Sequence, residues 1–422
     1  MGLRPRGLVH VGLAPGCRFC GAPLEHVVAD LGMSPLANAN IGADRANAME
    51  PFYPLRALVC ERCFLVQLED FESPQHIFGE DYAYFSSYSS SWLAHCQRYS
   101  EQIMRRLDLD GASQVIELAS NDGYLLQYFQ RAGVPVLGIE PARNVAAAAL
   151  ERGIPTRVEF FGVQSASALV DEQLRADLLL GNNVLAHVPD INDFVAGMAI
   201  VLAPGGTITI EFPHLLKLIE LNQWDTIYHE HFSYLSFAVV TRIFAAHGLR
   251  LFDVEELATH GGSLRIYGCH DDDARDVSDA ARELLERERA AGLEQLATYL
   301  AFGERVAEDK RAVVSLLIEL KREGHSIAGY GAPAKGNTLL NYCGVGNDFL
   351  DFTCDASPHK QGYLLPGTHI PILAPAAIAE HRPDVVLILP WNIKDEIMRE
   401  LAYIREWGGR FAARSPELKL FA

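Results

Sequence analysis

The chain has 422 residues, of which 49% are hydrophobic and 21% charged, and its formal net charge is -18. This composition is typical of a globular protein with two or three domains, not of a disordered chain. The negative charge disfavours nucleic acid as a partner but permits a local basic pocket for anionic small molecules. No apolar run is long enough to span a membrane, and the N-terminus lacks a signal-peptide pattern, so we expect a cytoplasmic protein.

The first 70 or so residues carry two cysteine pairs. Cys17 and Cys20 form the first pair, and Cys60 and Cys63 form the second after 39 intervening residues. Each pair places two thiolates on one tight turn, and two such turns supply the tetrahedral sulfur set that zinc prefers. Because all four positions are cysteines, none is left for water, and the predicted zinc is structural. The alternatives are a redox pair or four unrelated thiols.

An aromatic run (DYAYFSSYSSSW) and a helical stretch follow, and then short β-rich runs alternate with helical ones. The strand candidates are 115–118, 136–140, 157–161, 177–183, 207–212, 249–256 and 263–270. Parallel strands joined by helices are the natural interpretation of this alternation. The last two strands lie close together in sequence, which predicts an antiparallel hairpin at one edge of the sheet.

The segment VIELASNDGYLL (115–126) predicts a strand, a turn and a helix, which together direct backbone N–H groups at a ligand. The turn has one glycine, Gly123, so a nucleoside without phosphates fits better than a dinucleotide. Glu140 ends the next strand, where an acidic side chain accepts hydrogen bonds from ribose hydroxyls. Taken alone, the same segment also fits ordinary helix–strand packing.

The segment WDTIYHEHFSYLS (224–236) places two His, one Glu and two Tyr within seven residues. The His spacing does not match the helical zinc-protease motif. The alternatives are a polar surface loop or acid–base chemistry, in which a His takes a proton, a Glu orients it and a Tyr donates to an oxyanion.

A second, smaller α/β unit follows an acidic break at 271–283. A helical stretch over 278–323 predicts a packing helix or a dimer surface, and strands are expected in SIAGYGA, FLDFTCD, DVVLILP and RFAAR. Three turns, one just before this break and two after it, offer ligand contacts. They are THGGSLRIY with Arg265, GYGAPAKGN with Lys335 at a helix start, and CDASPHKQGYLLPGT with Lys360. The alternatives are a β-bulge for the first of these and ordinary βα turns for the other two.

Taken together and in order, the paired CxxC motifs, ELASNDG, YHEHFSY, HGGSLR and GYGAPAKGN resemble the sugar C-methyltransferases of deoxysugar pathways. Those enzymes methylate C-3 of nucleotide-linked 4-keto-6-deoxyhexoses, as in antibiotic biosynthesis. The resemblance covers nearly the whole chain. It implies an α/β protein with a zinc-binding domain (1–75), a class I methyltransferase domain with a Rossmann-like sheet that binds S-adenosylmethionine (76–275), and a Rossmann-like domain that binds the nucleotide sugar (276–422).

The resemblance also implies three sets of site residues. The catalytic set is His231, Tyr228, Glu230, His187 and Tyr82, with Tyr84 close enough to leave the last position open. The donor set is Glu117, Ala119, Asn121, Gly123, Glu140, Phe160 and Asn182. The acceptor set is Ser263, Arg265, Lys335, Asn337 and Lys360.

These residue types suit carbon methylation, because a C–H beside a ketone loses its proton once the enolate is stabilised. We expect His231 as the base, with Tyr228, His187 or Tyr82 as donors to the enolate oxygen. The expected partner is a keto-deoxysugar linked to dTDP or a similar nucleotide, with no membrane partner, and the chain is a monomer or homodimer. Two alternatives remain: methylation of an oxygen or nitrogen, and a non-catalytic binding protein on the same scaffold.

Overall fold

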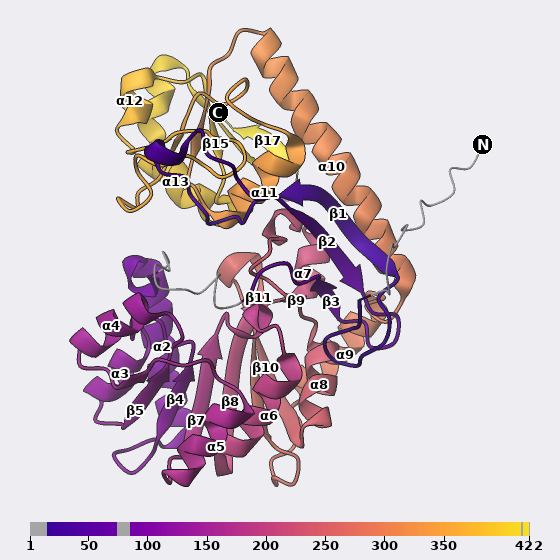
Figure 1. Ribbon diagram of the computed structural model, residues 1–422, viewed down its shortest axis with the longest axis vertical. Helices are drawn as coiled ribbons and strands as arrows, with labels where there is room; N and C mark the ends of the chain where they lie inside the picture. Colours follow the sequence, from indigo (N-terminus) through magenta and orange to yellow (C-terminus); the bar gives the residue numbers. More distant parts are fainter. Residues whose placement is uncertain (1–14, 74–84, 415–416, 422) are drawn as a thin grey trace.

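The computed structural model describes residues 15–73, 85–414 and 417–421, which form three β-sheets and the helices around them (Figure 1). A seven-stranded sheet is built from the middle of the chain, a six-stranded sheet from its C-terminal part, and a four-stranded sheet mainly from its N-terminal part. The predicted α/β fold is therefore confirmed. Within the described ranges, no helix combines the length and apolar character needed to cross a membrane.

The central sheet has the strand order β10-β11-β8-β7-β4-β5-β6. Its strands are β4 (Val115–Leu118), β5 (Val136–Ile139), β6 (Thr156–Arg157), β7 (Ala176–Asn182), β8 (Leu202–Pro213), β10 (Leu249–Leu257) and β11 (Ser263–His270). The five strands from β8 to β6 are parallel, and β10 and β11 form the predicted antiparallel hairpin. All seven predicted strands are present, but the third is only two residues long. It lies at the sheet edge, and the chain beyond it exposes Val158 and Phe160.

Apolar residues at successive positions explain why the central strands are buried on both faces. In β7, Leu178 and Leu180 belong to one core, whereas Leu179 belongs to another. The first core includes α2 (Ser90–Leu107), α3 (Leu126–Arg131) and part of α4 (Arg143–Glu151). The second includes α5 (Val163–Asp171), α6 (Ile191–Val201) and α8 (Phe237–Ala246), and α7 (Leu215–Glu220) follows β8.

The C-terminal sheet has the order β14-β13-β12-β15-β16-β17. Its strands are β12 (Ile327–Tyr330), β13 (Thr353–Cys354), β14 (Ile372–Leu373), β15 (Val385–Ile388), β16 (Arg410–Arg414) and β17 (Leu418–Phe421), and its helices are α11 (Ala334–Cys343), α12 (Ala377–His381) and α13 (Lys394–Glu400). The four expected strands are present and parallel. The short edge strands β14 and β17 were not predicted.

The N-terminal sheet joins β1 (His26–Ser34), β2 (Tyr53–Val59) and β3 (Val66–Leu68) to β9 (Ser233–Tyr234), a strand from the methyltransferase region. The predicted helical stretch consists of α9 (Asp279–Ala290) and α10 (Leu296–Arg322), and α10 packs along β1 (Figure 1). Gly303 permits this approach, because a Cβ there would lie 2.4 Å from the carbonyl oxygen of Val28. The stretch is therefore a packing element within the chain.

Two cores join the N-terminal sheet to the other parts. Cys17, Cys60 and Cys63 belong to the core of the central sheet, whereas Val28, Leu55 and other residues of β1 and β2 share a core with α10 and the C-terminal sheet. Short 3₁₀ turns connect the elements: η1 (Ala43–Arg45), η2 (Ser86–Tyr88), η3 (Leu185–His187), η4 (Trp224–Thr226), η5 (Thr259–Gly261), η6 (Trp391–Ile393) and η7 (Ala402–Trp407).

Candidate active site and zinc centre

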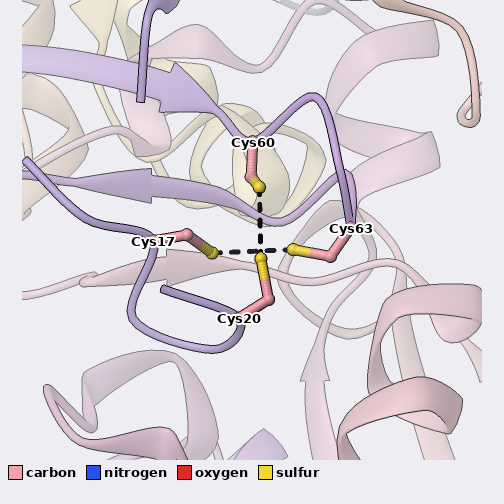
Figure 2. A group of neighbouring side chains, drawn as sticks. All are labelled: Cys17, Cys20, Cys60 and Cys63. Atoms are coloured by element: carbon pink, nitrogen blue, oxygen red, sulfur yellow. Dashed lines mark hydrogen bonds between the residues drawn. The ribbon is translucent and has the colours of Figure 1, made fainter. Parts of the chain in front are cut away.

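The four paired cysteines converge on one point (Figure 2). Their sulfur atoms all lie within 4.8 Å of one another, with 3.5 Å between Cys17 and Cys63 and 3.5 Å between Cys20 and Cys60. Zn–S bonds of about 2.3 Å place the sulfurs of a tetrahedral site about 3.8 Å apart, so the cluster fits a zinc ion. Because all four ligands come from the protein, the predicted structural site is supported.

The zinc cluster is bound closely to the methyltransferase domain. The side-chain amide of Gln67 donates to the sulfur of Cys17 (3.2 Å), and Arg242 on α8 donates to the carbonyl oxygen of Cys63 (3.2 Å). Arg18, in the first cysteine turn, donates to the carbonyl oxygen of Pro189 (2.6 Å). These hydrogen bonds fix the second cysteine turn, and β3 follows directly after that turn.

Strand β3 pairs with β9 and so holds the YHEHFSY segment. Val66 and Gln67 lie opposite Tyr234 and Ser233, and the N–H of Leu68 donates to the carbonyl oxygen of Phe232 (3.0 Å). His229 donates from Nε2 to the carbonyl oxygen of Pro54 (3.2 Å). His229 is therefore a packing residue, whereas its neighbours Tyr228 and His231 face other groups.

His231 has a defined tautomer. Its Nδ1–H donates to the carbonyl oxygen of Thr226 (3.1 Å), because a carbonyl can only accept, and Nε2 accepts from the hydroxyl of Tyr228 (2.9 Å). Burial lowers the pKa of His231 well below its ordinary value, and the neighbouring His187, His260 and Lys335 lower it further. The imidazole is therefore neutral at neutral pH, with Nε2 as its basic atom.

His187 lies against His231, with ring centroids 4.7 Å apart in a T-shaped arrangement. It belongs to η3, which begins shortly after β7 ends at Asn182. Burial lowers the pKa of His187 to about 4, opposed by its hydrogen bond to the backbone of Glu230. The structure thus brings together His187, Tyr228 and His231 at the carboxyl end of β7, whereas Tyr82 lies outside the described residues.

The carboxyl group of Glu230 has a partner other than the imidazole that it was expected to orient. It accepts from the side-chain amide of Asn38 (2.6 Å) in the N-terminal region. Burial raises the pKa of Glu230, and the Asn38 hydrogen bond and the charge of Lys360 oppose this shift. The carbonyl oxygen of Thr226 orients His231 instead, so the expected role of Glu230 as the orienting group is wrong.

The donor-site candidates lie at the carboxyl ends of the three adjacent strands β7, β4 and β5. Burial raises the pKa of Glu117 well above its ordinary value, and within the described part of the chain its carboxylate pairs with no cation. The amide nitrogen of Asn182 is buried and has no acceptor among the described residues. A buried acidic group without a counter-charge suits a ligand that carries an ammonium and a sulfonium, as S-adenosylmethionine does.

The loop after β4 has an unusual backbone conformation, of a kind that lets the main chain approach a bound ligand closely. Ala119, Asn121 and Gly123 all have positive φ (54°, 50° and 76°), and a Cβ at Gly123 would lie 2.8 Å from Ile154. The N–H groups of Asn121 and Ala142 donate to the two carboxylate oxygens of Glu140 (2.9 and 2.8 Å). The remaining donor candidate, Phe160, is an exposed side chain beyond β6.

Two of the five acceptor-site candidates are lysines of the C-terminal domain. Lys335, at the start of α11, donates to Asn392 (2.9 Å) and lies over the ring of Trp391, 4.5 Å from its centroid. Burial lowers the pKa of Lys335 to about 8. Lys360 donates to the carbonyl oxygen of Ala332 (2.8 Å).

The other three acceptor candidates are occupied by contacts within the protein. Asn337 donates to the carbonyl oxygen of Ala37 (2.6 Å), and Ser263 donates to that of Thr259 (3.0 Å). Arg265 is 3% exposed and pairs with Glu211 and Glu255 across the β8–β11–β10 strands (3.0 Å each). Ser263 and Arg265 therefore make their contacts within the methyltransferase domain, whereas Asn337 lies two residues after Lys335 in α11.

His260 was not among the predicted residues, although it lies in the HGGSLR motif. It has a positive φ of 53° and its Nε2 accepts from the side-chain amide of Asn183 (3.2 Å). A Cβ at the next residue, Gly261, would lie 2.6 Å from Trp391 of the C-terminal domain. The two glycines of this motif permit close packing between domains, and that signal could have identified His260 as a neighbour of the site.

Family models match three consecutive parts of the chain: a zinc binding domain (17–78), a methyltransferase domain (92–254) and a C-methyltransferase C-terminal domain (258–416). The C-methyltransferase NovU of Streptomyces niveus is 36% identical over 406 residues, which is 96% of each chain. The chain belongs to this C-methyltransferase family. The protein uses S-adenosylmethionine as methyl donor and contains a zinc-binding domain. Its membership of the family supports carbon methylation over the two alternatives that the sequence left open.

Other relatives match a smaller share of the chain. The ubiquinone biosynthesis O-methyltransferase of Rhodopseudomonas palustris (strain BisB18) is 28% identical over 118 residues, or 28% of this chain and 46% of that protein. The solved structure of the PH0226 protein from Pyrococcus horikoshii OT3 covers 47% of this chain and 99% of its own, with 14% identity and a TM-score of 0.37.

We expect one zinc per chain in the freshly purified enzyme and its loss in the variant Cys63→Ser. Structural zinc stabilises small folded sites by on the order of 10 kcal/mol, so losing a ligand should unfold the N-terminal region and release β9. Plasma mass spectrometry measures the metal, and Cys269→Ser, which alters a buried thiol outside the cluster, should retain it. Wild-type protein without zinc would contradict the assignment.

We expect the affinity for S-adenosylmethionine to depend on the ionisation of Glu140. Burial raises the pKa of Glu140 to about 7, so below that pH the group must lose a proton before it accepts from ribose hydroxyls. The contribution of Glu140 should therefore fall about tenfold per pH unit below 7. Glu140→Ala should weaken binding about tenfold to a hundredfold at pH 8, because a charge-assisted hydrogen bond contributes roughly 1.5–3 kcal/mol.

Calorimetric titrations of both proteins from pH 5.5 to 8 measure this dependence. The Glu140→Ala profile is the reference, because the ligand's own amino group titrates in the same way with both proteins. The exposed Glu151→Ala on α4 is the matched control and should follow the wild type. Equal affinities for wild type and Glu140→Ala at every pH would show that Glu140 does not bind the ribose.

Proposed function

We propose that this enzyme methylates C-3 of a nucleotide-linked 4-keto-6-deoxy sugar through an enolate, with His231 as the base. The observation that carries the proposal is the tautomer of His231: Nδ1–H is bound to the Thr226 carbonyl, and Nε2 is left as an acceptor facing the Tyr228 hydroxyl. This arrangement prepares one ring nitrogen to receive a proton beside the carboxyl end of β7, where the donor-site candidates also lie.

The proposed proton transfer uses groups that the structure places together. Nε2 of His231 takes the proton from C-3, and the resulting imidazolium keeps its Nδ1–H bond to Thr226. The Nε2 lone pair that takes this proton is the one that accepts from Tyr228, so the Tyr228 hydroxyl releases it and donates instead to the enolate oxygen at C-4. His187, neutral because burial lowers its pKa to about 4, is a second donor beside His231.

When bound, S-adenosylmethionine would supply an electrophilic methyl group to C-3 of the enolate and leave as S-adenosylhomocysteine when its sulfur–methyl bond breaks. Glu117, Asn182 and Glu140, together with the loop of Ala119, Asn121 and Gly123, are the proposed residues that hold it. Phe160 remains a candidate for the adenine side because it follows β6 at the same edge of the sheet. The zinc ion lies in a closed site and is not needed in any of these steps.

The proposed site for the nucleotide is on the C-terminal domain. Lys335 stands at the first turn of α11, where backbone N–H groups and the helix dipole also favour an anion. Its pKa of about 8 leaves it mostly charged at neutral pH, and a diphosphate beside it would raise that pKa. Lys360 lies on a turn that contacts the Ala332 carbonyl, and Asn337 lies in α11 two residues after Lys335. These groups offset the overall charge of -18 locally, at the proposed site of the anionic acceptor.

We further propose that the enzyme acts in the cytoplasm on a free nucleotide sugar, such as a dTDP-linked one, without a nucleic acid or membrane partner. A pathway of deoxysugar biosynthesis, as in antibiotic production, is the corresponding biological setting. The family membership supports this setting through carbon methylation, which requires an acidified C–H of the kind that a keto sugar offers.

His231→Asn should abolish methyl transfer while both ligands still bind. Asparagine keeps a polar side chain but cannot take a proton at neutral pH, and general-base catalysis contributes about 10²–10⁴-fold. With a dTDP-4-keto-6-deoxyhexose in heavy water, the wild type should exchange the C-3 hydrogen for deuterium, and the variant should not. Mass spectrometry of the recovered sugar measures the exchange. The same substitution at His247, at the C-terminal end of α8, is the control.

Tyr228→Phe separates the base from the enolate donor. If His231 is the base, this variant should lower kcat with little change in KM, because the Tyr228 bond to the enolate forms mainly in the transition state. If His231→Asn keeps near-normal turnover while His187→Asn or Tyr228→Phe loses exchange completely, the base is not His231.

Lys335→Ala should weaken the nucleotide and leave the methyl donor unaffected. Titration with dTDP tests this without knowledge of the sugar, and loss of a charged contact to a diphosphate predicts a roughly tenfold to hundredfold higher Kd. Lys394→Ala on α13 removes a lysine of the same domain that pairs with Asp395, and it should bind dTDP as the wild type does. Equal weakening of dTDP and S-adenosylmethionine by Lys335→Ala would contradict a dedicated acceptor site.

A further inference from the structure

A buried charged cluster joins the C-terminal domain to the turn that precedes the YHEH motif. Arg414 at the end of β16 donates from Nη1 to Asp225 in η4 (2.9 Å) and from Nε to Asp309 in α10 (2.6 Å). The three side chains are 2%, 0% and 7% exposed. Arg414 also donates to the carbonyl oxygen of Asn222. One guanidinium therefore fixes two carboxylates and a backbone carbonyl from two separate segments, the η4 region and α10.

Two tryptophans complete the cluster, because a single guanidinium cannot satisfy two buried carboxylates. The indole N–H of Trp224 donates to Asp309 (2.6 Å), and that of Trp391 donates to Asp225 (2.6 Å). The guanidinium of Arg414 also lies over the Trp224 ring, 4.7 Å from its centroid. Burying ions is costly unless every one is paired, and each of these is paired with defined geometry. Hydrophobic residues would fill such an interface at lower cost, so the cluster points to a need for orientation.

The cluster orients the η4 turn, which carries the carbonyl oxygen that accepts a hydrogen bond from His231. Asp225 is the central residue of η4, and Thr226 is its last residue. The carbonyl oxygen of Thr226 receives the Nδ1–H of His231, while Thr338 on α11 donates to the next carbonyl, that of Ile227 (3.0 Å). The C-terminal domain thus holds this turn through a side-chain carboxylate and a backbone carbonyl on either side of Thr226.

We propose that Arg414, Asp225 and Asp309 are positioning residues that set the tautomer of His231 through the Thr226 carbonyl, an inference that rests on the proposed role of His231 as base. Docking of the C-terminal domain then does more than bring the nucleotide to the site. It also places the carbonyl that keeps the proton on Nδ1 and leaves Nε2 unprotonated.

Arg414→Lys tests the inference, because lysine keeps the charge but lacks the planar fork that reaches Asp225, Asp309 and Asn222 together. In protein labelled with ¹⁵N-histidine, the wild type should show His231 protonated on Nδ1, and the variant should show a mixture of tautomers. The variant's kcat should fall about tenfold, with the dTDP and S-adenosylmethionine affinities within about twofold of wild type. Arg410→Lys alters an arginine of the same strand that contacts His325, and it should change none of these values.

Asp309→Asn is the second variant, for use if Arg414→Lys yields little folded protein, since it preserves volume and should shift the tautomer in the same direction. A His231 that keeps its wild-type Nδ1–H signal in the folded variants overturns the inference. The nitrogen spectrum is recorded without turnover, so the test is independent of the proposed chemistry. A shifted tautomer with wild-type kcat and C-3 exchange would leave the positioning role intact and contradict His231 as the base.

Discussion

The backbone hydrogen bonds between β3 and β9 are the contact on which the other features of the site depend. They place Tyr234 and Ser233 opposite Val66 and Gln67, directly after the second cysteine turn. Because zinc fixes that turn, a metal that takes no part in the chemistry still determines where the YHEH segment lies. The remaining contacts of the segment, to Asn38, Pro54 and Thr226, then follow from its position.

Electrostatics divides the site into a neutral centre and a charged periphery. Burial keeps His187, His231 and His260 uncharged, since each has a lowered pKa. Full charges lie further out, either paired, as in Arg265 with Glu211, or at the acceptor side, as in Lys335. A neutral His231 has an unprotonated Nε2, which is the state that the proposed proton abstraction requires.

Local patterns identified much of this fold and part of the site. The paired cysteines, the doubly buried strands such as 177–183 and the YHEH segment each carry their signal within a few residues. The pairing of β3 with β9, by contrast, depends on two short segments far apart in the chain, and neither has strand periodicity of its own. Arg414 and Asp225 are 189 positions apart, so nothing local marks them as partners. The resemblance placed Arg265 and Glu230 in the site, but a motif does not show which partners its side chains contact, and these two bind Glu211 and Asn38.

The composite N-terminal sheet also imposes an order on biosynthesis. Strands β1 to β3 leave the ribosome first, but the edge of β3 has no partner until Ser233 and Tyr234 are made, and β1 has no cover until α10 follows. At usual translation rates this interval lasts on the order of ten seconds or more. An uncovered strand edge is a template for association with other nascent chains. Early capture of zinc by the four cysteines, all of which precede residue 64, would hold the nascent sheet in shape during this wait.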